Sequence, residues 1–475
     1  MLNAQTTDRP NILWIVADDM SANLSCYGET LIETPHLDKL ASNGIQFTKA
    51  FVTSPVCSTN RSAFITGMYQ TSIGAHHHRS GRGELKINLP DGIRPVPELF
   101  QEAGYYTAIT GWPGRDRQNL GKTDYNFEWD RAMYDGPDWS KRKPGQPFFA
   151  QIQLRGGKHR GGDLAASRKF AKQIEKMFGN KTDPAKVTLP PYYPDDPVLR
   201  EDWAAYLDSV RITDKFVGDA IQRLKEEGNL GNTVVIFMTD HGISHARGKQ
   251  FLYEEGIHIP FIVAGAGIEA SQVRDDLIEH IDIAAISLGL AGIKIPDYMQ
   301  AKDIISPDYK KRNVIFSARD RCDETIEHLR CLRTNRYKYI RNFLYKRPHM
   351  QPNRYKDNKD IIKALLAAHK AGALNEAQSL IFNAPRPKEE LFDLKKDPHE
   401  IQNLADDPKH EKRLIRFRNK LARWMKHTND HGPESQARYD SDMAVYLKSK
   451  SADPVQGKIL TDNITLMKKW ASEGK

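Results

Sequence analysis

The sequence has few cysteines and lacks long apolar segments. Its four cysteines, Cys26, Cys57, Cys322 and Cys331, occur among 475 residues, too few and too scattered for a disulfide framework or a zinc knuckle. Cys322 and Cys331 are close enough in sequence to pair across a hairpin, and the sequence leaves this pairing open. No uninterrupted apolar stretch reaches the length that crosses a bilayer, so we expect no membrane insertion.

Internal repeats, low-complexity segments and an apolar signal core are also absent. The first residues, MLNAQTTDRP, are polar and fit either a cytosolic protein or one whose signal peptide has been removed. The net charge of +9 attracts polyanions such as nucleic acids or acidic polysaccharides. Because Lys and Arg are spread along the chain without a compact module of aromatic and basic residues, nucleic acid is not an expected partner.

The apolar pattern favours an α/β fold. Hydrophobic residues make up 39% of the chain, enough for one large core or two unequal domains. Short β-branched runs alternate with helical segments, which predicts a doubly wound α/β sheet with helices on both faces. PNILWIVADDM, residues 10–20, is typical of a buried parallel strand ending at two aspartates, and residues 233–242 end a second strand at Asp240 and His241.

The texture of the sequence changes near residue 310. Polar, alternating segments such as LRCLRTNRYKYIRNFLY and EELFDLKKDP follow, which indicates an antiparallel sheet. The segment KHEKRLIRFRNKLARWMKHT predicts a helix packed on that sheet. We therefore expect an α/β domain over residues 1–310 and a smaller α+β subdomain over residues 311–475.

Carboxylates at strand ends point to a metal site. Because functional groups gather beyond the carboxyl ends of the strands in such sheets, Asp18, Asp19, Asp240 and His241 are expected to lie together. Three carboxylates in one crevice repel one another unless a cation neutralises them. Cys57 lies in the polar stretch SPVCSTNRSAFITG, whereas a buried structural cysteine normally packs in an apolar run.

Six segments resemble the type I sulfatase family of the alkaline phosphatase superfamily in their order and approximate spacing. They are PNILWIVADD, CSTNR followed by TG, GYYTAITG, FMTDHG, RGKQFLYEEGIHIPFIV and ELFDLKKDPHEIQNLA. The resemblance implies a sulfuric ester hydrolase whose Cys57 is oxidised to formylglycine by a formylglycine-generating enzyme. In the implied mechanism a hydroxyl of the hydrated aldehyde attacks sulfur, and expulsion of sulfate then regenerates the aldehyde.

The resemblance also assigns roles to individual residues. The implied Ca²⁺ ligands are Asp18, Asp19, the modified Cys57, Asp240 and His241. Arg61 would hold the diol and the metal carboxylates in place, and Lys122 takes the position of the family lysine after the GYYTA strand. Lys249 would contact the sulfate and the leaving oxygen. His159, in LRGGKHRGG, is the candidate general acid, because an imidazole can give up a proton near neutral pH.

The chain departs from the family pattern at two positions of the expected site. Thr59 replaces the usual Pro or Ala two residues after the cysteine, which bears on how the modifying enzyme recognises Cys57. Asp124 replaces a histidine two residues after Lys122, and we interpret it as a partner of the site or a substrate contact. The expected substrate-binding residues are His76, His77, His78, Arg79, Asp124, His245 and Arg247, with an ordinary surface loop as the alternative for GAHHHRS.

Several functions remain open within this resemblance. We expect an O-sulfated polysaccharide or oligosaccharide as substrate, and a periplasmic or secreted protein. The segment FDLKKDPHEIQNLADDP resembles the end of N-sulfoglucosamine sulfohydrolases, which keeps a sulfamate substrate as the second choice. A phosphatase or phosphodiesterase of the superfamily, with a Ser or Thr nucleophile and two zinc ions, is a further alternative. A non-catalytic protein that binds polyanionic glycans is the last.

Overall fold

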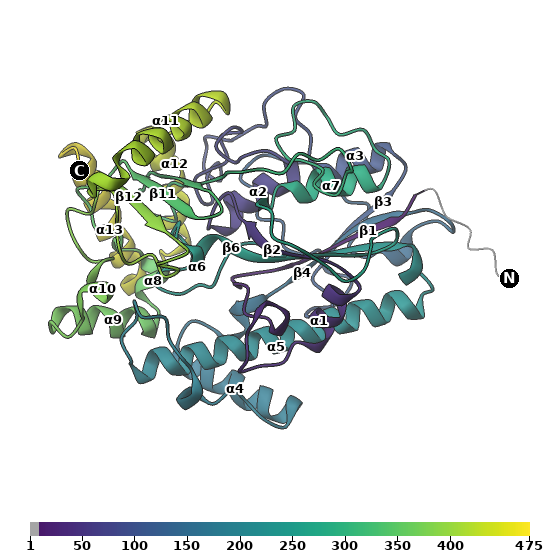
Figure 1. Cartoon of the computed structure of the whole chain (residues 1–475), viewed down its shortest axis with the longest axis horizontal. Helices are drawn as coiled ribbons and strands as arrows, with labels where there is room; N and C mark the ends of the chain where they lie inside the picture. Colours follow the sequence, from purple (N-terminus) through teal and green to yellow (C-terminus); the bar gives the residue numbers. More distant parts are fainter. Residues whose placement is uncertain (1–8) are drawn as a thin grey trace.

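The computed structural model describes residues 9–475 and shows a central sheet between two layers of helices (Figure 1). The expectation about a signal peptide concerns the polar start of the chain, and residues 1–8 lie outside the described part. The strands of this sheet are β1 Asn11–Ala17, β2 Gly44–Phe51, β3 Tyr106–Thr110, β4 Phe148–Leu154, β5 Thr233–Thr239, β6 His258–Gly265, β7 Gln272–Arg274 and β8 Ile278–Glu279. Within the described residues their order is β3-β4-β1-β5-β6-β2-β7, with β8 paired to β2.

The centre of the sheet is parallel, as the apolar runs predicted. β1 pairs in parallel with β4 and β5, and all side chains of these three strands are buried. β6 runs antiparallel to both β5 and β2. Between β5 and β6 the only helix is the short α6, Glu254–Ile257, and a parallel neighbour needs a longer crossover. The sheet is therefore mixed.

Helices cover both faces of the sheet. One layer contains α1 Pro35–Ser42, α4 Leu164–Phe178 and α5 Pro197–Glu226, and the other contains α2 Cys57–Thr66, α3 Val96–Glu102 and α7 Asp282–Leu290 (Figure 1). The carboxylate of Asp196 accepts hydrogen bonds from the backbone N–H of Val198 and Leu199 and so caps the long α5. α2 ends at Gly67, whose φ of 65° is left-handed, a conformation that favours glycine. The helices on both faces agree with the predicted architecture.

A second, smaller sheet follows in the chain and is antiparallel. Its order is β12-β11-β10-β9, with β9 Ile315–Arg319, β10 Leu329–Arg333, β11 Tyr337–Asn342 and β12 Glu389–Asp393. The helices of this region are α8 Arg354–Asp357, α9 Asp360–Lys370, α10 Glu376–Ser379, α11 Glu411–His427, α12 Gln436–Ser449 and α13 Pro454–Ser472. The predicted antiparallel sheet is confirmed, while the division into domains at residue 310 stays a prediction. Across residues 9–475, no helix combines the length and the apolar character that crossing a membrane requires.

Helix α11 joins the two sheet regions through one aromatic side chain. Trp424 is buried and stacks on Phe316 of β9, with ring centroids 4.8 Å apart. Its other neighbour is Tyr69, which follows α2 and meets the indole edge-on at 5.1 Å. Because the indole touches an aromatic ring from each region, Trp424 packs the smaller sheet against the larger part of the fold.

We expect Trp424→Ala to lower the free energy of unfolding by about 3–5 kcal/mol, because it opens a cavity between these rings. The matched control is Ile415→Ala on the same helix, where the side chain is 44% exposed and the change should be within about 0.5 kcal/mol. Chemical denaturation followed by tryptophan-independent far-UV circular dichroism measures both. Equal losses for the two variants would contradict the assigned role of Trp424.

Candidate active site

The carboxyl ends of β1 and β5 bring the predicted acidic residues together. Asp18 and Asp19 directly follow β1, and Asp240 and His241 directly follow β5. The two strands pair in parallel from Asn11↔Thr233 to Ala17↔Thr239, so both ends emerge at one edge of the sheet. The backbone N–H of Asp19 donates to Oδ1 of Asp240 at 3.1 Å. This bond fixes the two strand ends against each other.

Two glycines allow a third chain segment to approach this edge. Gly156 and Gly157 begin a 3-10 helix, Gly156–Arg160, immediately beyond β4. A Cβ atom on Gly156 would lie 2.1 Å from the carbonyl oxygen of Asp18, and one on Gly157 would lie 2.2 Å from that of Asp19. Any larger residue would therefore push the segment away from the acidic strand end. The close approach gives the unusual Gly-Gly pair of the sequence a structural reason.

Cys57 stands at the centre of the acidic cluster as the first residue of α2. Its Sγ lies 3.1 Å from Nε2 of His241 and 3.8 Å from Oδ1 of Asp19, and all three side chains are buried. Nδ1 of His241 lies 2.9 Å from the carbonyl oxygen of Gly242, which can only accept a hydrogen bond. Nδ1 therefore carries a proton, and Nε2 faces the cluster. Burial alone would lower the pKa of the His241 ring, but Asp240, Cys57 and Asp19 raise it to about 10.

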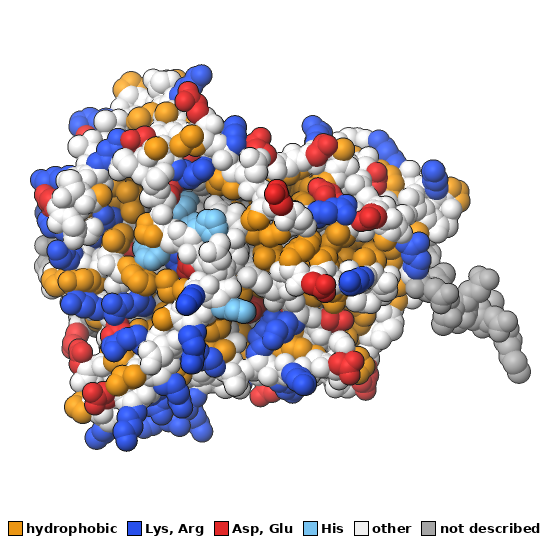
Figure 2. Space-filling view, turned by 90° about the horizontal axis from the view of Figure 1, so that it is seen from above, with side chains coloured by type: hydrophobic (Ala, Val, Ile, Leu, Met, Phe, Trp, Pro, Cys, Tyr) orange, Lys and Arg blue, Asp and Glu red, His pale blue; other side chains and the backbone are white. Residues whose placement is uncertain are grey.

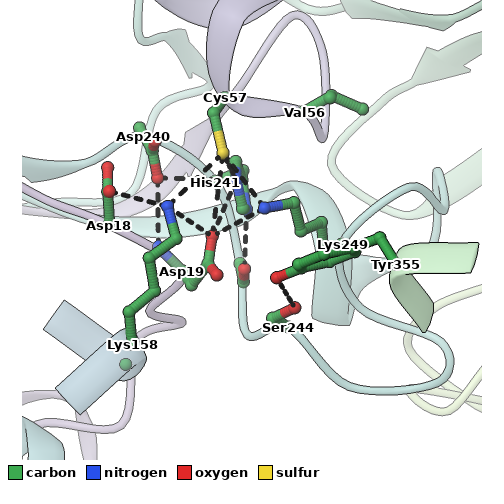
Figure 3. Close-up of polar contacts among 12 residues, drawn as sticks. Asp18, Asp19, Val56, Cys57, Lys158, Asp240, His241, Ser244, Lys249 and Tyr355 are labelled. Atoms are coloured by element: carbon green, nitrogen blue, oxygen red, sulfur yellow. Dashed lines mark hydrogen bonds and ion pairs between the residues drawn. The ribbon is translucent and has the colours of Figure 1, made fainter. Parts of the chain in front are cut away.

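Three lysines and one arginine surround these groups, and Figure 3 shows two of the lysines, Lys158 and Lys249, pointing toward Cys57. Lys249 Nζ lies 3.1 Å from both Cys57 Sγ and Asp19 Oδ1. Lys158 Nζ lies 2.7 Å from Asp18 Oδ2 and 3.7 Å from Cys57 Sγ.

Lys122 and Arg61 complete the cationic surroundings. Lys122 Nζ lies 3.1 Å from Asp18 Oδ2. Arg61 donates to carboxylate oxygens of both Asp18 and Asp240. The Arg61 guanidinium is buried, so it holds the carboxylates of the two strand ends at a fixed separation.

The charges around Cys57 favour its anionic form. Burial alone would raise the pKa of the thiol, but Lys122, Lys158 and Lys249 outweigh burial and hold this pKa well below its usual range. Burial is likewise outweighed at Asp18, where Lys122, Lys158 and Arg61 lower the carboxyl pKa. The pocket is thus built to hold negative charge at Cys57 and at a group bound next to it.

The donor set fits a hard divalent cation. Ligand atoms of Asp19, Cys57 and His241 all lie within 4.8 Å of one another, and Asp18 and Asp240 contribute further carboxylate oxygens at the same edge. Carboxylate oxygens are the ligands that Ca²⁺ prefers. Nε2 of His241 becomes a nitrogen ligand once it has given up its proton. The predicted ligands are therefore brought together by the fold, and they suit the ion that the sequence resemblance implies.

His159 does not reach this cluster. Its neighbour Lys158 lies beside Cys57, in the place where His159 was expected. The His159 ring stacks on Phe170 of α4 at 6.0 Å and lies 5.8 Å from Phe216 of α5. Burial lowers its pKa to about 4, so the ring is neutral at pH 7. In a 3-10 helix neighbouring side chains point about 120° apart, so Lys158 and His159 face different surroundings. The assignment of His159 as general acid is corrected.

The expected substrate-binding residues separate into two groups. His78 Nδ1 lies 2.7 Å from Ser58 Oγ on α2, and Asp124 Oδ2 lies 3.8 Å from Lys122 Nζ. Arg79, whose side chain is 46% exposed, approaches the same Asp124 at 3.9 Å. These three residues border the nucleophile helix. Figure 2 shows several histidines near the middle of one face, with lysine and arginine side chains around them.

The other expected contacts are directed elsewhere. His76 Nε2 lies 2.6 Å from the carbonyl oxygen of Gly432, and the His77 ring packs against that of His76 at 4.1 Å. His245 packs against Tyr193 and Trp203, and Arg247 lies between the rings of Tyr192 and Tyr253. These four side chains are held by aromatic and C-terminal contacts, and their assignment to the substrate pocket stays a prediction.

The sequence reasoning missed Lys158 and Tyr355. Tyr355 belongs to α8, and the Lys249 ammonium lies 5.1 Å from its ring centroid. Burial alone would raise the pKa of its phenol, but Lys249 and Lys359 lower it. Lys158 carried a signal, because it follows the Gly-Gly pair at the end of the strand next to β1. Tyr355 carried none, because it lies almost 300 residues from Cys57.

Comparison with known proteins identifies the family of the chain. The model of the sulfatase family matches residues 10–293. The chain belongs to the sulfatase family. A second model, that of the N-sulphoglucosamine sulphohydrolase C-terminal region, matches residues 242–365. The resemblance predicted from the motifs is thus confirmed.

Individual sulfatases show the same relationship along most of the chain. An ulvan-active sulfatase of Formosa agariphila is 32% identical, covering 90% of this chain and 77% of that protein. Human N-sulphoglucosamine sulphohydrolase is 26% identical, covering 88% and 90%. The solved structure of a putative sulfatase from Bacteroides thetaiotaomicron has a TM-score of 0.64 at 21% identity. The match covers 91% of this chain and 96% of that one. The last match supports the alkaline-phosphatase-like fold of this sulfatase.

We predict that Lys158→Ala lowers kcat/KM for a sulfate ester by about 10²–10³-fold, the usual effect of removing one preorganised donor from a reacting anion. The matched control is the neighbouring His159→Ala, which should leave kcat/KM within a few-fold and lower thermal stability instead, because its ring packs on Phe170. Steady-state kinetics of the two variants distinguishes the roles. A large loss in His159→Ala with normal Lys158→Ala would restore the histidine as the acid.

Proposed function

We propose that this sulfatase hydrolyses sulfate esters on a sulfated polysaccharide or oligosaccharide, with formylglycine derived from Cys57 as nucleophile and calcium at the strand-end carboxylates. The observation that carries the proposal is the position of Cys57, buried at the start of α2 among three carboxylates and three lysines. The names of the ulvan-active and N-sulphoglucosamine relatives support a glycan substrate. We place its action outside the cytoplasm, where sulfated polysaccharides occur, together with maturation by a formylglycine-generating enzyme.

The ligands for calcium would be Asp18, Asp19, Asp240, His241 and the modified Cys57. When bound there, calcium supplies positive charge to the sulfate oxygens. Arg61 keeps the carboxylates of Asp18 and Asp240 in register, since it contacts both. The Nδ1 proton of His241 is held by the Gly242 carbonyl, so Nε2 is the nitrogen that coordinates once it has given up its proton.

Lys158 and Lys249 would bind the transferred group. Their ammonium nitrogens lie 3.7 and 3.1 Å from Cys57 Sγ, and each also contacts an aspartate that keeps it in place. Donors fixed in this way stabilise developing negative charge without having to reorganise. Lys122, held by Asp18 and Asp124, extends the same cationic wall. The exposed Arg79 beside Asp124 lies at the rim, where it can meet further acidic groups of a polyanion.

The alternative functions fit this geometry less well. A two-zinc phosphatase requires several histidines at the metals, but within residues 9–475 His241 is the one histidine in the cluster around Cys57. A glycan-binding protein without activity would not need a buried cysteine surrounded by lysines and carboxylates, as Cys57 is. The C-terminal match to N-sulphoglucosamine sulphohydrolases favours a sulfamate as the second substrate class.

Mass spectrometry of the peptide containing Cys57, from protein made in its native host, tests the nucleophile. Conversion to formylglycine lowers the peptide mass by about 18 Da, the difference between CH₂SH and CHO. Cys57→Ala should abolish sulfate release, whereas Cys331→Ala, at a buried thiol of β10, should retain it. An unmodified Cys57 in fully active protein would contradict the proposal.

Removal of calcium tests the metal. Because three carboxylates remain close together without it, chelation with EGTA should reduce sulfate release at least about 100-fold, and added Ca²⁺ should restore it. The same assay, in which ion chromatography measures released sulfate, distinguishes the two substrate classes. The rate with sulfated polysaccharide fragments is compared with the rate with N-sulfoglucosamine. A faster rate with N-sulfoglucosamine would show that a sulfamate, and not an ester, is the preferred substrate. Activity that chelation removes and that added Zn²⁺, but not Ca²⁺, restores would favour the phosphatase type of centre.

A further inference from the structure

A second group of buried metal-ligating side chains lies beside the nucleophile helix. It consists of His78, Cys322 and Asp323, whose ligand atoms all lie within 4.8 Å of one another. Nε2 of His78 is 3.6 Å from Oδ1 of Asp323, and Sγ of Cys322 is 3.8 Å from Oδ2 of Asp323. None of the three belongs to the cluster around Cys57, although His78 is among the substrate contacts expected from the sequence.

The distances suit a tetrahedral zinc site. Zinc binds nitrogen and oxygen at about 2.0 Å and sulfur at about 2.3 Å, so tetrahedral ligand atoms are separated by roughly 3.3–3.6 Å. The 3.6 Å separation of His78 and Asp323 lies at the upper end of this range, and the 3.8 Å separation of Cys322 and Asp323 lies just above it, a difference that small side-chain rotations can close. One imidazole, one thiol and one carboxylate form a ligand set that zinc accepts.

Asp323 has no guanidinium partner of the kind that nearby buried carboxylates have. Asp320 is paired with Arg330, and Asp442 with Arg321. Within the described residues, the one ion pair of the Asp323 carboxylate is with His78, and its other side-chain contacts are the hydroxyl of Tyr446 and the thiol of Cys322. A cation bound among these groups would pair with the buried carboxylate directly.

Cys322 also differs from an ordinary core cysteine. Cys331 is part of the large apolar cluster of the protein, whereas Cys322 is fully buried outside the apolar clusters. Its backbone is fixed by reciprocal hydrogen bonds with Thr325, both 3.0 Å long, and its carbonyl oxygen accepts from Asn353. The thiol is thus held next to Asp323 by a rigid turn rather than by apolar packing.

Outer contacts orient the other two side chains. Ser58 Oγ lies 2.7 Å from Nδ1 of His78 and accepts from the backbone N–H of Arg79. The hydroxyl of Tyr446 on α12 donates to Oδ1 of Asp323 at 3.0 Å. Supports of this kind, which fix the ring and the carboxylate, are typical of metal ligands.

We propose that His78, Cys322 and Asp323 bind one zinc ion, with water as the fourth ligand. Binding forms Zn–N, Zn–S and Zn–O bonds and releases the thiol proton of Cys322 to solvent. The ion ties the loop after α2 to the turn between β9 and β10, and so joins the larger and smaller sheet regions next to Cys57. This site shares no ligand with the proposed calcium position.

The test uses the full chain carrying Cys57→Ala, in buffer that contains excess Ca²⁺. The substitution removes the thiol of residue 57 as a zinc ligand, and Ca²⁺ occupies the nearby carboxylates. Equilibrium dialysis with Zn²⁺ and elemental analysis should give one zinc per chain. Co²⁺ in place of zinc should produce a thiolate-to-metal charge-transfer absorption. Zinc should also raise the thermal unfolding midpoint, because it binds the folded state.

Matched variants in this background locate the ion. Cys322→Ala should lower zinc affinity at least about tenfold and remove the charge-transfer absorption, whereas Cys331→Ala, an equal truncation of a buried thiol, should change neither. Asp323→Asn keeps the shape of its side chain and should also weaken zinc binding, which covers the case that Cys322→Ala fails to fold. The proposal would be overturned if the parent chain bound no zinc. It would also be overturned if Cys322→Ala and Asp323→Asn both bound zinc as tightly as the parent chain. Neither result bears on sulfate release.

Discussion

Mutual repulsion among buried carboxylates is the constraint on which the active site of this sulfatase depends. Asp18, Asp19 and Asp240 share one edge of the sheet because β1 and β5 are parallel neighbours. Each carboxylate is buried, so water screens their repulsion poorly. Arg61 and the surrounding lysines oppose this repulsion, and the same cations make the position of Cys57 suitable for an anion. Stability and chemistry therefore use one set of charges.

Three distant chain segments must meet for this balance to exist. The segment after β4 brings Lys158, α2 brings Cys57 and Arg61, and the loop after β5 brings Lys249. The absence of side chains at Gly156 and Gly157 lets the first of these approach the strand end within hydrogen-bonding distance, and Gly157 N–H donates to the Asp18 carbonyl at 2.8 Å. Small residues at this point are thus as necessary to the site as the charged ones.

The smaller sheet region also contributes to the surroundings of Cys57. Tyr355 from α8 lies against Lys249, and the turn that contains Cys322 and Asp323 approaches His78. Trp424 packs this region on the larger one. The C-terminal part of the chain is therefore a wall of the pocket as well as a packing partner of the α/β part. Cys322 and Cys331 have free thiols, so no disulfide is needed to hold this wall.

Local sequence was sufficient to predict those elements whose position in the fold depends on their own residues alone. The apolar run before Asp18 and Asp19 predicted a buried strand, and the run before Asp240 predicted its partner, because burial on both faces of a parallel sheet demands such runs. Ordered motifs around Cys57 indicated the family. The fold, the strand-end cluster and the position of Arg61 followed from these patterns together.

Tertiary structure decided which neighbours of these motifs face the site. Lys158 and His159 are adjacent and equally suited to the chemistry by residue type, but the 3-10 helix turns the first toward Asp18 and the second toward Phe170. His245 and Arg247 lie in an active-site loop, yet aromatic rings pack around both. Sequence by itself determined the strands, the strand-end position of the acidic residues and the family. Side-chain direction depended on packing between segments far apart in the chain, which no local pattern encodes.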